Sequence, residues 1–168
     1  NIRELSIISI GEDSLLAIFE RSSSESRGIY SRMSTDNGSI WSDSLIISDY
    51  GYYEKKPKVI KLSNGKIVLS YLRNNVIDAV DYDDDDIFFK FSTDNGSSWS
   101  NENRFTKYIG EDSYINLSSF QNKAFISFAT ERFSTIHHNE SSFQIALGIL
   151  EESVEKFTPP KVFATYTP

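Results

Sequence analysis

The sequence predicts an all-β protein built from three consecutive four-stranded antiparallel units, which we interpret as three blades of a β-propeller. Short apolar runs separated by turn residues recur along the chain, and no stretch has a helical period. In addition, one eight-residue stretch occurs twice, as Ser-Thr-Asp-Asn-Gly-Ser-Ile-Trp at 34–41 and as Ser-Thr-Asp-Asn-Gly-Ser-Ser-Trp at 92–99. This repeat divides the chain, a single propeller segment, into units at about 1–52, 53–110 and 111–168.

Each unit opens with a predicted β-hairpin. Two apolar runs flank a short polar turn, and in the second unit this turn contains Asn64-Gly65, a strong hairpin signal. The paired runs are 7–10 and 15–19, then 58–62 and 66–71, then 114–117 and 123–128. The matching order of the three hairpins supports a common structural unit.

Two more strands complete each unit. They are expected at 28–33 and 44–47, at 87–91 and 103–107, and at 143–150 and 161–164. A four-stranded sheet cannot cover both of its own faces, whereas radial stacking against neighbouring sheets buries them. Four strands in roughly 50 to 58 residues is therefore the size expected of a propeller blade.

The composition describes a folded, acidic chain. It has 168 residues, 39% hydrophobic and 14% aromatic, which is enough to bury a core. The 24 acidic and 17 basic residues give a net charge of −7 without a basic cluster, so we expect no nucleic-acid partner. No run of about 18 apolar residues occurs, so we expect no membrane span. No signal peptide is visible, and a start at Asn1 rather than Met is what a mature or excised piece would show.

The repeated stretch has the composition of a self-stapled turn between a third and a fourth strand. Its Gly supplies a positive φ, and its Asp carboxylate can accept hydrogen bonds from backbone N–H groups of the same turn. Its Ser can add a further bond, and its Trp brings a large apolar surface that pins the turn against the blade. These residues are Ser34, Asp36, Gly38 and Trp41 in the first copy and Ser92, Asp94, Gly96 and Trp99 in the second.

The pattern Ser-x-Asp-x-Gly-x-x-Trp resembles the Asp-box, or BNR repeat, of the sialidase superfamily of β-propellers. The resemblance extends over about the whole chain, although the third unit has lost the Gly and the Trp at 151–155. It implies a sialidase-like propeller of six blades, of which this chain would form half. It also implies that the box lies at the blade periphery, away from the substrate pocket, so Asp36 and Asp94 are expected to be structural.

The same resemblance places a ligand site at the opposite mouth, on the loops that follow the second strands, at 21–27, 73–86 and 131–142. Sialidases also carry an Arg-Ile-Pro motif on the first strand. This chain has Ile-Arg-Glu-Leu at 2–5, followed by Leu-Leu-Ala-Ile-Phe-Glu at 15–20. Arg3 is therefore the position onto which a carboxylate-binding arginine can be carried.

Three further arginines, Arg21, Arg73 and Arg132, recur just after the second strand of each unit. Two arrangements are open for them: convergence on the axis as ligand groups, or ion pairs with Glu20, Asp78 and Glu131. A sialidase also needs an Asp acid/base and a Tyr activated by a Glu, and the sequence identifies neither. The catalytic residues therefore stay unknown.

Two clusters of polar residues contain side chains that could bind a metal ion. The acidic run Asp81–Asp86 could hold calcium, but it lacks the Gly and distal Glu of an EF-hand loop, so a solvated acidic loop is favoured. His137-His138, near Glu140, could hold zinc, but adjacent side chains of an extended chain point apart, so a surface pair is favoured. With no Cys present, we expect no disulfide and no thiolate metal site. Since the solvated and surface interpretations of the two clusters are favoured, we also expect no bound metal and no cofactor.

The expected function is that of a glycan-recognising Asp-box propeller module, catalytically incomplete as it stands, with a carbohydrate or glycoconjugate as ligand. One alternative is the N-terminal half of an exo-sialidase or related glycoside hydrolase, which would need further blades or a partner. Another is a structural subunit of an extracellular or surface assembly. An extracellular or cell-surface location is expected, where four N-x-Ser sequons would permit glycosylation, at Asn37, Asn95, Asn116 and Asn139.

The two terminal blades are expected to expose bare apolar faces. Large apolar faces do not stay exposed in a stable monomer. We therefore expect a homo-oligomer, or the remaining blades of a longer chain as partners.

Overall fold

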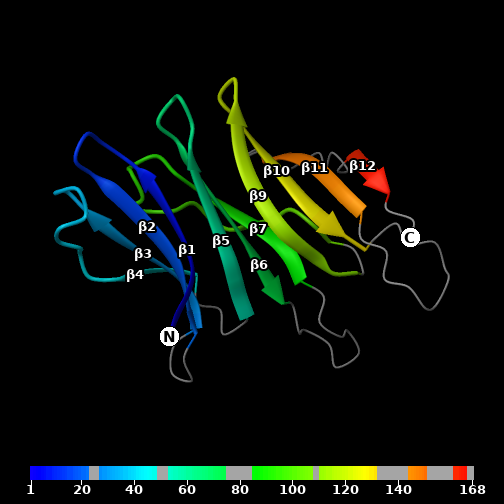
Figure 1. Ribbon diagram of the computed structural model, residues 1–168, viewed down its shortest axis with the longest axis horizontal. Coiled ribbons are helices and arrows are strands. Elements are labelled where there is room, and N and C mark those ends of the chain that lie inside the picture. Colours follow the sequence, from blue (N-terminus) through cyan, green and yellow to red (C-terminus); the bar gives the residue numbers. More distant parts are fainter. Residues whose placement is uncertain are drawn as a thin grey trace.

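The computed structural model describes residues 1–22, 27–48, 53–74, 85–107, 110–131, 144–150 and 161–165, the last of these without their side chains. These residues form three four-stranded antiparallel sheets, each a simple meander in which neighbours in sequence are neighbours in the sheet (Figure 1). The predicted fold class, an all-β chain of propeller blades, is confirmed.

The first sheet, blade 1, contains β1 Ile2–Ser9, β2 Leu15–Ser22, β3 Arg27–Ser34 and β4 Leu45–Ser48. Blade 2 contains β5 Tyr53–Lys61, β6 Ile67–Asn74, β7 Asp85–Ser92 and β8 Asn103–Arg104. Blade 3 contains β9 Asp112–Phe120, β10 Lys123–Thr130, β11 Gln144–Leu150 and β12 Lys161–Thr165. No helix among the described residues is long and apolar enough to cross a membrane.

The strands differ from the predicted ones mainly at their ends. β8 stops at Arg104, earlier than the predicted 103–107, because the hydroxyl of Thr106 replaces a backbone partner. The Ile87 N–H donates to Thr106 Oγ1 at 2.7 Å, while the Phe105 N–H donates to the Ile87 carbonyl. The first strands begin earlier than predicted, because an irregularity near their start hides the alternation of apolar and polar residues.

That irregularity is a bulge at the same place in β1, β5 and β9. The pairing register shifts there in all three blades. A residue other than glycine adopts a positive φ at each bulge: Glu4 at 43°, Lys56 at 54° and Tyr114 at 51°. Such conformations are costly for side chains of this kind, and they concentrate at functional sites.

The apolar core lies between the blades. Ile67, Leu69 and Tyr71 of β6 pack against blade 1, whereas Val68 and Leu72 of the same strand pack against blade 3. Every residue of β6 and β7 is buried, which explains why the middle blade reads as nearly continuous apolar runs. The blades are therefore held together by two interblade clusters.

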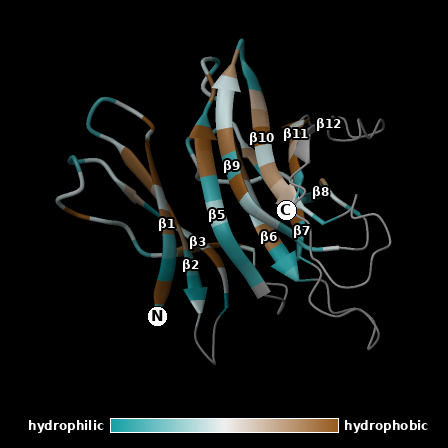
Figure 2. Cartoon of the chain, turned by 45° about the vertical axis from the view of Figure 1, so that its right-hand side comes forward, coloured by the Kyte–Doolittle hydropathy of each residue, from teal (hydrophilic) through white to brown (hydrophobic). Residues whose placement is uncertain are grey.

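The first strands lie side by side, with β5 between β1 and β9 (Figure 1). Figure 2 shows that β5 is hydrophilic over its first half and hydrophobic toward its arrowhead. The hydrophilic half contains the bulge. β5, the middle one of the three first strands, thus has a polar end and an apolar end.

Candidate functional site

One end of the blades carries the two repeated turns, which are closed by their own side chains. In the first turn, Ser34 Oγ donates to Asp36 Oδ1 at 2.7 Å and accepts from the Gly38 N–H at 2.9 Å. Asp36 Oδ1 also accepts from the Ile40 N–H at 2.8 Å. These bonds hold the pKa of Asp36 below its usual value, the Ile40 N–H most strongly and the Ser34 hydroxyl next.

The second turn repeats this network. Ser92 Oγ donates to Asp94 Oδ1 at 2.8 Å and accepts from the Gly96 N–H at 2.8 Å, and the Ser98 N–H donates to Asp94 Oδ1 at 2.9 Å. Ser98 stands where the first copy has Ile40, and its hydroxyl adds a bond to Asp94 Oδ2 at 2.5 Å. The Ser98 hydroxyl and N–H, with the Ser92 hydroxyl, lower the pKa of Asp94 to about 2.

Both turns are fastened to neighbouring elements at the hairpin end of the blades. Asn37 donates through its side chain to Asp13 Oδ1 at 2.8 Å, on the β1–β2 turn. Gly96 approaches blade 1 so closely that a Cβ would lie 2.7 Å from Leu16 Cδ2. Trp99 packs on the cluster between blades 1 and 2. The carboxylates of these turns are engaged by their own backbone, which is the geometry of a structural clamp.

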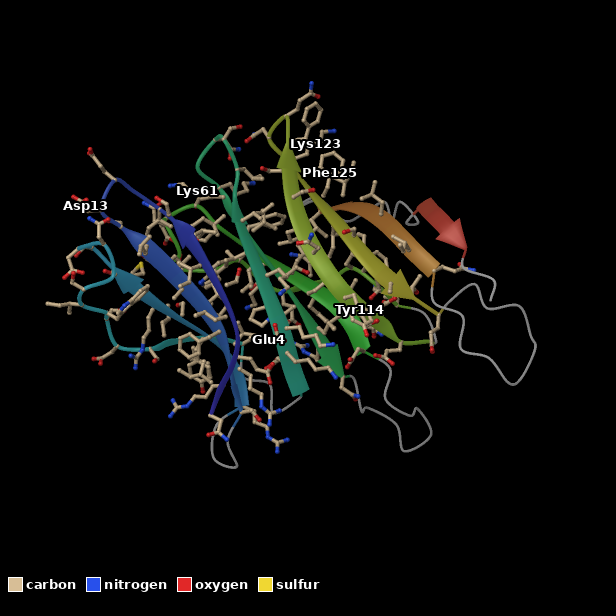
Figure 3. All side chains as sticks on the ribbon, viewed as in Figure 1. Glu4, Asp13, Lys61, Tyr114, Lys123 and Phe125 are labelled. Atoms are coloured by element: carbon tan, nitrogen blue, oxygen red, sulfur yellow. The ribbon has the colours of Figure 1, made fainter. Side chains whose placement is uncertain are left out.

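The opposite end carries the three bulges and a different kind of surface. Tyr114 is 76% exposed although it stands on a first strand, and the Lys56 ammonium lies over its ring, 5.5 Å from the ring centroid. Lys58 Nζ lies 3.8 Å from Glu4 Oε2, so an ion pair joins β5 to β1. Figure 3 shows Glu4 and Tyr114 on the lower half of the first strands, away from Asp13. We call Glu4, Lys56, Lys58 and Tyr114 the bulge strip.

Carboxylates gather next to the bulge strip. Lys55 Nζ binds Asp85 Oδ2 at 2.7 Å, and the Lys56 N–H donates to Glu20 Oε2 at 3.4 Å. Partial burial raises the pKa of Glu111, and the negative charges of Asp85 and Glu131 raise it further. A carboxyl group whose pKa is raised by burial and by neighbouring acidic side chains is the arrangement that general acids use.

The candidate arginines do not form one group. Arg3 is exposed on β1 and is paired in register with Glu20. Arg21 lies over the ring of Tyr30, with 5.6 Å between the guanidinium carbon and the ring centroid. Arg73 is buried and binds two carboxylates of its own blade, Glu54 at 3.2 Å and Glu102. A ligand role for Arg3 and Arg21 stays a prediction, whereas the guanidinium of Arg73 is enclosed.

The described residues contain one arrangement that resembles a glycosidase nucleophile. The Tyr71 hydroxyl donates to Glu102 Oε2, and Arg73 binds the same oxygen. Tyr71 is fully buried, and burial together with the Glu102 charge raises its pKa far above the usual value. A nucleophilic Tyr needs access to substrate and an accessible phenolate, so this pair serves packing between blades 1 and 2.

The interpretation of the acidic run as a solvated loop is wrong for its last two members. Asp85 and Asp86 belong to β7 and are buried, and they bind Lys55 and Arg104 respectively. The arginine and lysine partners come from other strands, so sequence alone does not reveal them. Among the residues described, no group of three or more acidic or histidine side chains could hold a metal ion.

Several predicted features lie outside the described residues. They are Arg132, Asp78, Asp81–Asp84, the pair His137-His138 with Glu140, the turn at 151–155 and the sequon at Asn139. The other three sequon residues, Asn37, Asn95 and Asn116, are all exposed. Sequence reasoning missed the bulge strip, because its members share a backbone conformation and no residue type.

No known protein family matches the sequence, and no curated protein is similar to it. The fold is similar to solved propellers. A Hadza microbial sialidase, Hz136, matches with a TM-score of 0.71 at 11% identity, over 99% of this chain and 38% of its own. The α-L-arabinanase of Penicillium chrysogenum, solved with arabinobiose, matches with a TM-score of 0.69 at 16% identity, over 98% of this chain and 50% of its own.

A third structure, the GH93 α-L-arabinofuranosidase of Fusarium graminearum, matches with a TM-score of 0.65 at 15% identity, over 96% of this chain and 48% of its own. This chain thus spans half or less of these three proteins. At such identities the likeness shows the fold alone. The chain has the fold of part of a β-propeller, as found in sialidases and in arabinan-related glycoside hydrolases.

Proposed function

We propose that this chain is a glycan-recognising segment of a β-propeller and that its ligand site is the bulge strip. The proposal is supported by the fold, which structures named as sialidases and arabinofuranosidases share. It is also supported by the contrast between the two ends of the blades. At one end the carboxylates of Asp36 and Asp94 accept hydrogen bonds from their own turns, whereas the bulge end presents the exposed side chains of Glu4 and Tyr114.

The observation that carries the proposal is the exposed ring of Tyr114. A bulky residue at a positive φ destabilises the folded chain, so a Tyr at this bulge calls for a compensating benefit such as ligand binding. An exposed ring offers an apolar face on which the C–H groups of a pyranose or furanose ring can pack, and a hydroxyl that can bond to the sugar. Tyr114 on β9 would therefore be the stacking platform.

The charged members of the strip supply groups that orient a sugar. Lys56 stands beside the ring of Tyr114, and Lys58 and Glu4 follow across β5 and β1. Ammonium groups donate and carboxylates accept, so the strip can bond to sugar hydroxyls in both directions. An apolar platform with a few polar groups nearby is the usual composition of a small-molecule site.

The test is binding of Tyr114→Ala to an array of sialosides and arabino-oligosaccharides, followed by calorimetry with the best ligand. We expect affinity at least tenfold below wild type, about 1.4 kcal/mol. Phe120→Ala is the matched control, because Phe120 is an exposed aromatic residue at the hairpin end of the same strand. Equal binding by Tyr114→Ala and wild type would overturn the assignment of the site.

A second candidate function, half of the active site of a glycoside hydrolase, is favoured by the raised pKa of Glu111 beside Asp85 and Glu131. Turnover of aryl sialosides and aryl arabinofuranosides by wild type is the first measurement. If turnover occurs, Glu111→Gln should lower kcat, whereas Glu12→Gln, at an exposed position of the β1–β2 turn, should not. Full activity in Glu111→Gln would remove Glu111 from this role.

We also propose an extracellular or cell-surface location and, as an alternative function, a structural role in an assembly. The exposed sequons at Asn37 and Asn95 support the first. Secretion of the chain from a eukaryotic host, with a mass change on enzymatic deglycosylation, would show that these sequons can be used.

A further inference from the structure

Equivalent positions on the three first strands are all apolar, yet only those in blade 1 are exposed. Ile7, Val59 and Leu117 are paired with the equivalent residues Ala17, Leu69 and Ile126 on the second strands. Val59 and Leu117 are 5% and 9% exposed because a preceding blade covers them, whereas Ile7 is 49% exposed. The next positions toward the bulge behave alike: Leu5 is exposed, whereas Pro57 and Ile115 are buried.

The second and third strands of blade 1 repeat the aromatic arrangement that blade 2 uses in its interface. Tyr71 and Phe88 stack with ring centroids 6.2 Å apart and an interplanar angle of 16°. Phe19 and Tyr30, at the equivalent register, stack at 6.1 Å and 17°. In blade 2 this pair packs into the cluster shared with blade 1. The outer face of blade 1 therefore carries the same stacked aromatic pair as the face of blade 2 that packs on blade 1.

Blade 3 carries the complementary face. Ile29 and Ile87 face the following blade and have no exposed surface, whereas Ile145, at the equivalent register of β11, is 54% exposed. Ile149, equivalent to the buried Phe91, is also exposed. Blade 1 thus leaves Leu5 and Ile7 of β1 uncovered on the face that would receive a preceding blade, whereas Phe19 and Tyr30 on the same face are buried. Blade 3 leaves Ile145 and Ile149 of β11 uncovered on the face that would receive a following blade.

We propose that these two faces meet between two copies of the chain, so that the outer face of blade 1 of each copy receives the outer face of blade 3 of the other. Each chain carries both halves of the contact, and two copies related by a two-fold axis close a ring of six blades with no face left over. The contact reuses the packing already present between blades 1 and 2. A ring of this kind would also place two bulge strips around one axis.

The internal interfaces suggest which residues meet across the new one. The Val59 N–H donates to Ser6 Oγ at 3.3 Å across the contact of blades 1 and 2. By register, Ile7 is the counterpart of Val59, and Asn116 is the counterpart of Ser6. Ile7 of one copy should therefore lie beside Asn116 of the other.

The first test is the mass of the chain in solution by light scattering at micromolar concentration. We expect twice the 19.2 kDa of one chain for wild type and a shift to the single mass for Ile7→Lys. Ile40→Lys is the matched control, because Ile40 is more exposed than Ile7 and lies on the first Asp-box turn. A wild type that stays monomeric overturns the proposal and leaves further blades of a longer polypeptide as the occupants.

The second test does not depend on the folding of the lysine variant. The chain contains no Cys, so Ile7→Cys and Asn116→Cys each introduce a single thiol. Under mild oxidation a mixture of the two variants should give a reducible covalent dimer, whereas each variant alone should give none. Cross-linking of one variant with itself, or none in the mixture, contradicts the pairing of blade 1 with blade 3.

Discussion

The two ends of the blades differ in what the repeat keeps. At one end, the repeated turns at 34–41 and 92–99 share their residues and their hydrogen bonds almost one for one. At the other end, the three bulges share a backbone conformation but carry Glu4, Lys56 and Tyr114. The repeated turns keep the same side chains because their backbone is held by those side chains. The bulges carry different side chains, and those side chains form the exposed surface. The shared side chains thus belong to the scaffold, and the differing ones belong to the candidate site.

The largest expected effect is the loss of stability on replacing the glycines of the two repeated turns. Gly96 and Gly38 both have a φ close to 90°, but a Cβ on Gly96 would meet Leu16 at 2.7 Å, whereas a Cβ on Gly38 would meet Leu15 at 3.5 Å. Gly96→Ala should therefore cost about 2–4 kcal/mol in the free energy of unfolding, and Gly38→Ala about 1–2 kcal/mol. Urea denaturation measures both.

A double variant identifies the cause of that difference. Leu16→Ala removes the side chain that Gly96→Ala would meet. The cost of Gly96→Ala should fall in this background toward that of Gly38→Ala. Equal costs for the two glycine variants in the wild-type background would show that the close approach of blades 1 and 2 is unimportant.

The next effect concerns the carboxylates of the two turns. Asp94→Asn should lower the melting temperature at pH 7 more than Asp36→Asn does, because Asp94 accepts an additional bond from the Ser98 hydroxyl. The pKa of Asp94 is lowered from 3.8 to about 2, so its ionised form stabilises the fold above pH 3.8. The difference between wild type and Asp94→Asn should therefore fade as the pH drops from about 4 to 2.

Measuring glycan binding distinguishes a structural role of Asp36 and Asp94 from a role in ligand binding. If the carboxylates of Asp36 and Asp94 are structural, both asparagine variants should keep the ligand affinity of wild type at temperatures where they are folded. A folded Asp94→Asn that has lost ligand binding would contradict the division between the two ends.

A smaller effect of opposite sign is expected at the bulge end. Tyr114 adopts a φ of 51°, a conformation that Asn tolerates better than Tyr. Tyr114→Asn should raise the free energy of unfolding by about 1 kcal/mol while it weakens glycan binding. Tyr114→Phe keeps the strained backbone and the ring, so it should keep the stability of wild type and most of its binding. Lower stability of Tyr114→Asn would show that the ring contributes to packing.

The smallest effect concerns Glu111. Burial and the nearby charges of Asp85 and Glu131 raise its pKa, so its ionised form is less favourable in the folded state than in the unfolded one. Glu111→Gln should therefore raise the melting temperature slightly at pH 7. This gain should shrink as the pH falls through the raised pKa of Glu111 and vanish below its unfolded value of 4.5. A gain that does not depend on pH would point to a cause other than charge.

Much of the fold was predictable, because hairpins and turns depend on residues that are close together in the sequence. The hairpin at Asn64-Gly65 and the turns around Asp36 and Asp94 lie where their residues place them. The candidate site was less predictable. A positive φ at Tyr114 has no signature in a residue type, and the apolar alternation of β9 is interrupted there.

The sequence by itself determined the strands and the two repeated turns, because those depend on residues within one hairpin or one loop. Only the tertiary structure decided which charges are buried and which surfaces are free. Arg73, Asp85 and Asp86 look like exposed loop residues in the sequence, but partners from other strands enclose them. Conversely, Ile7 and Val59 are equivalent in sequence and differ in exposure, because burial depends on which blade lies beside each one.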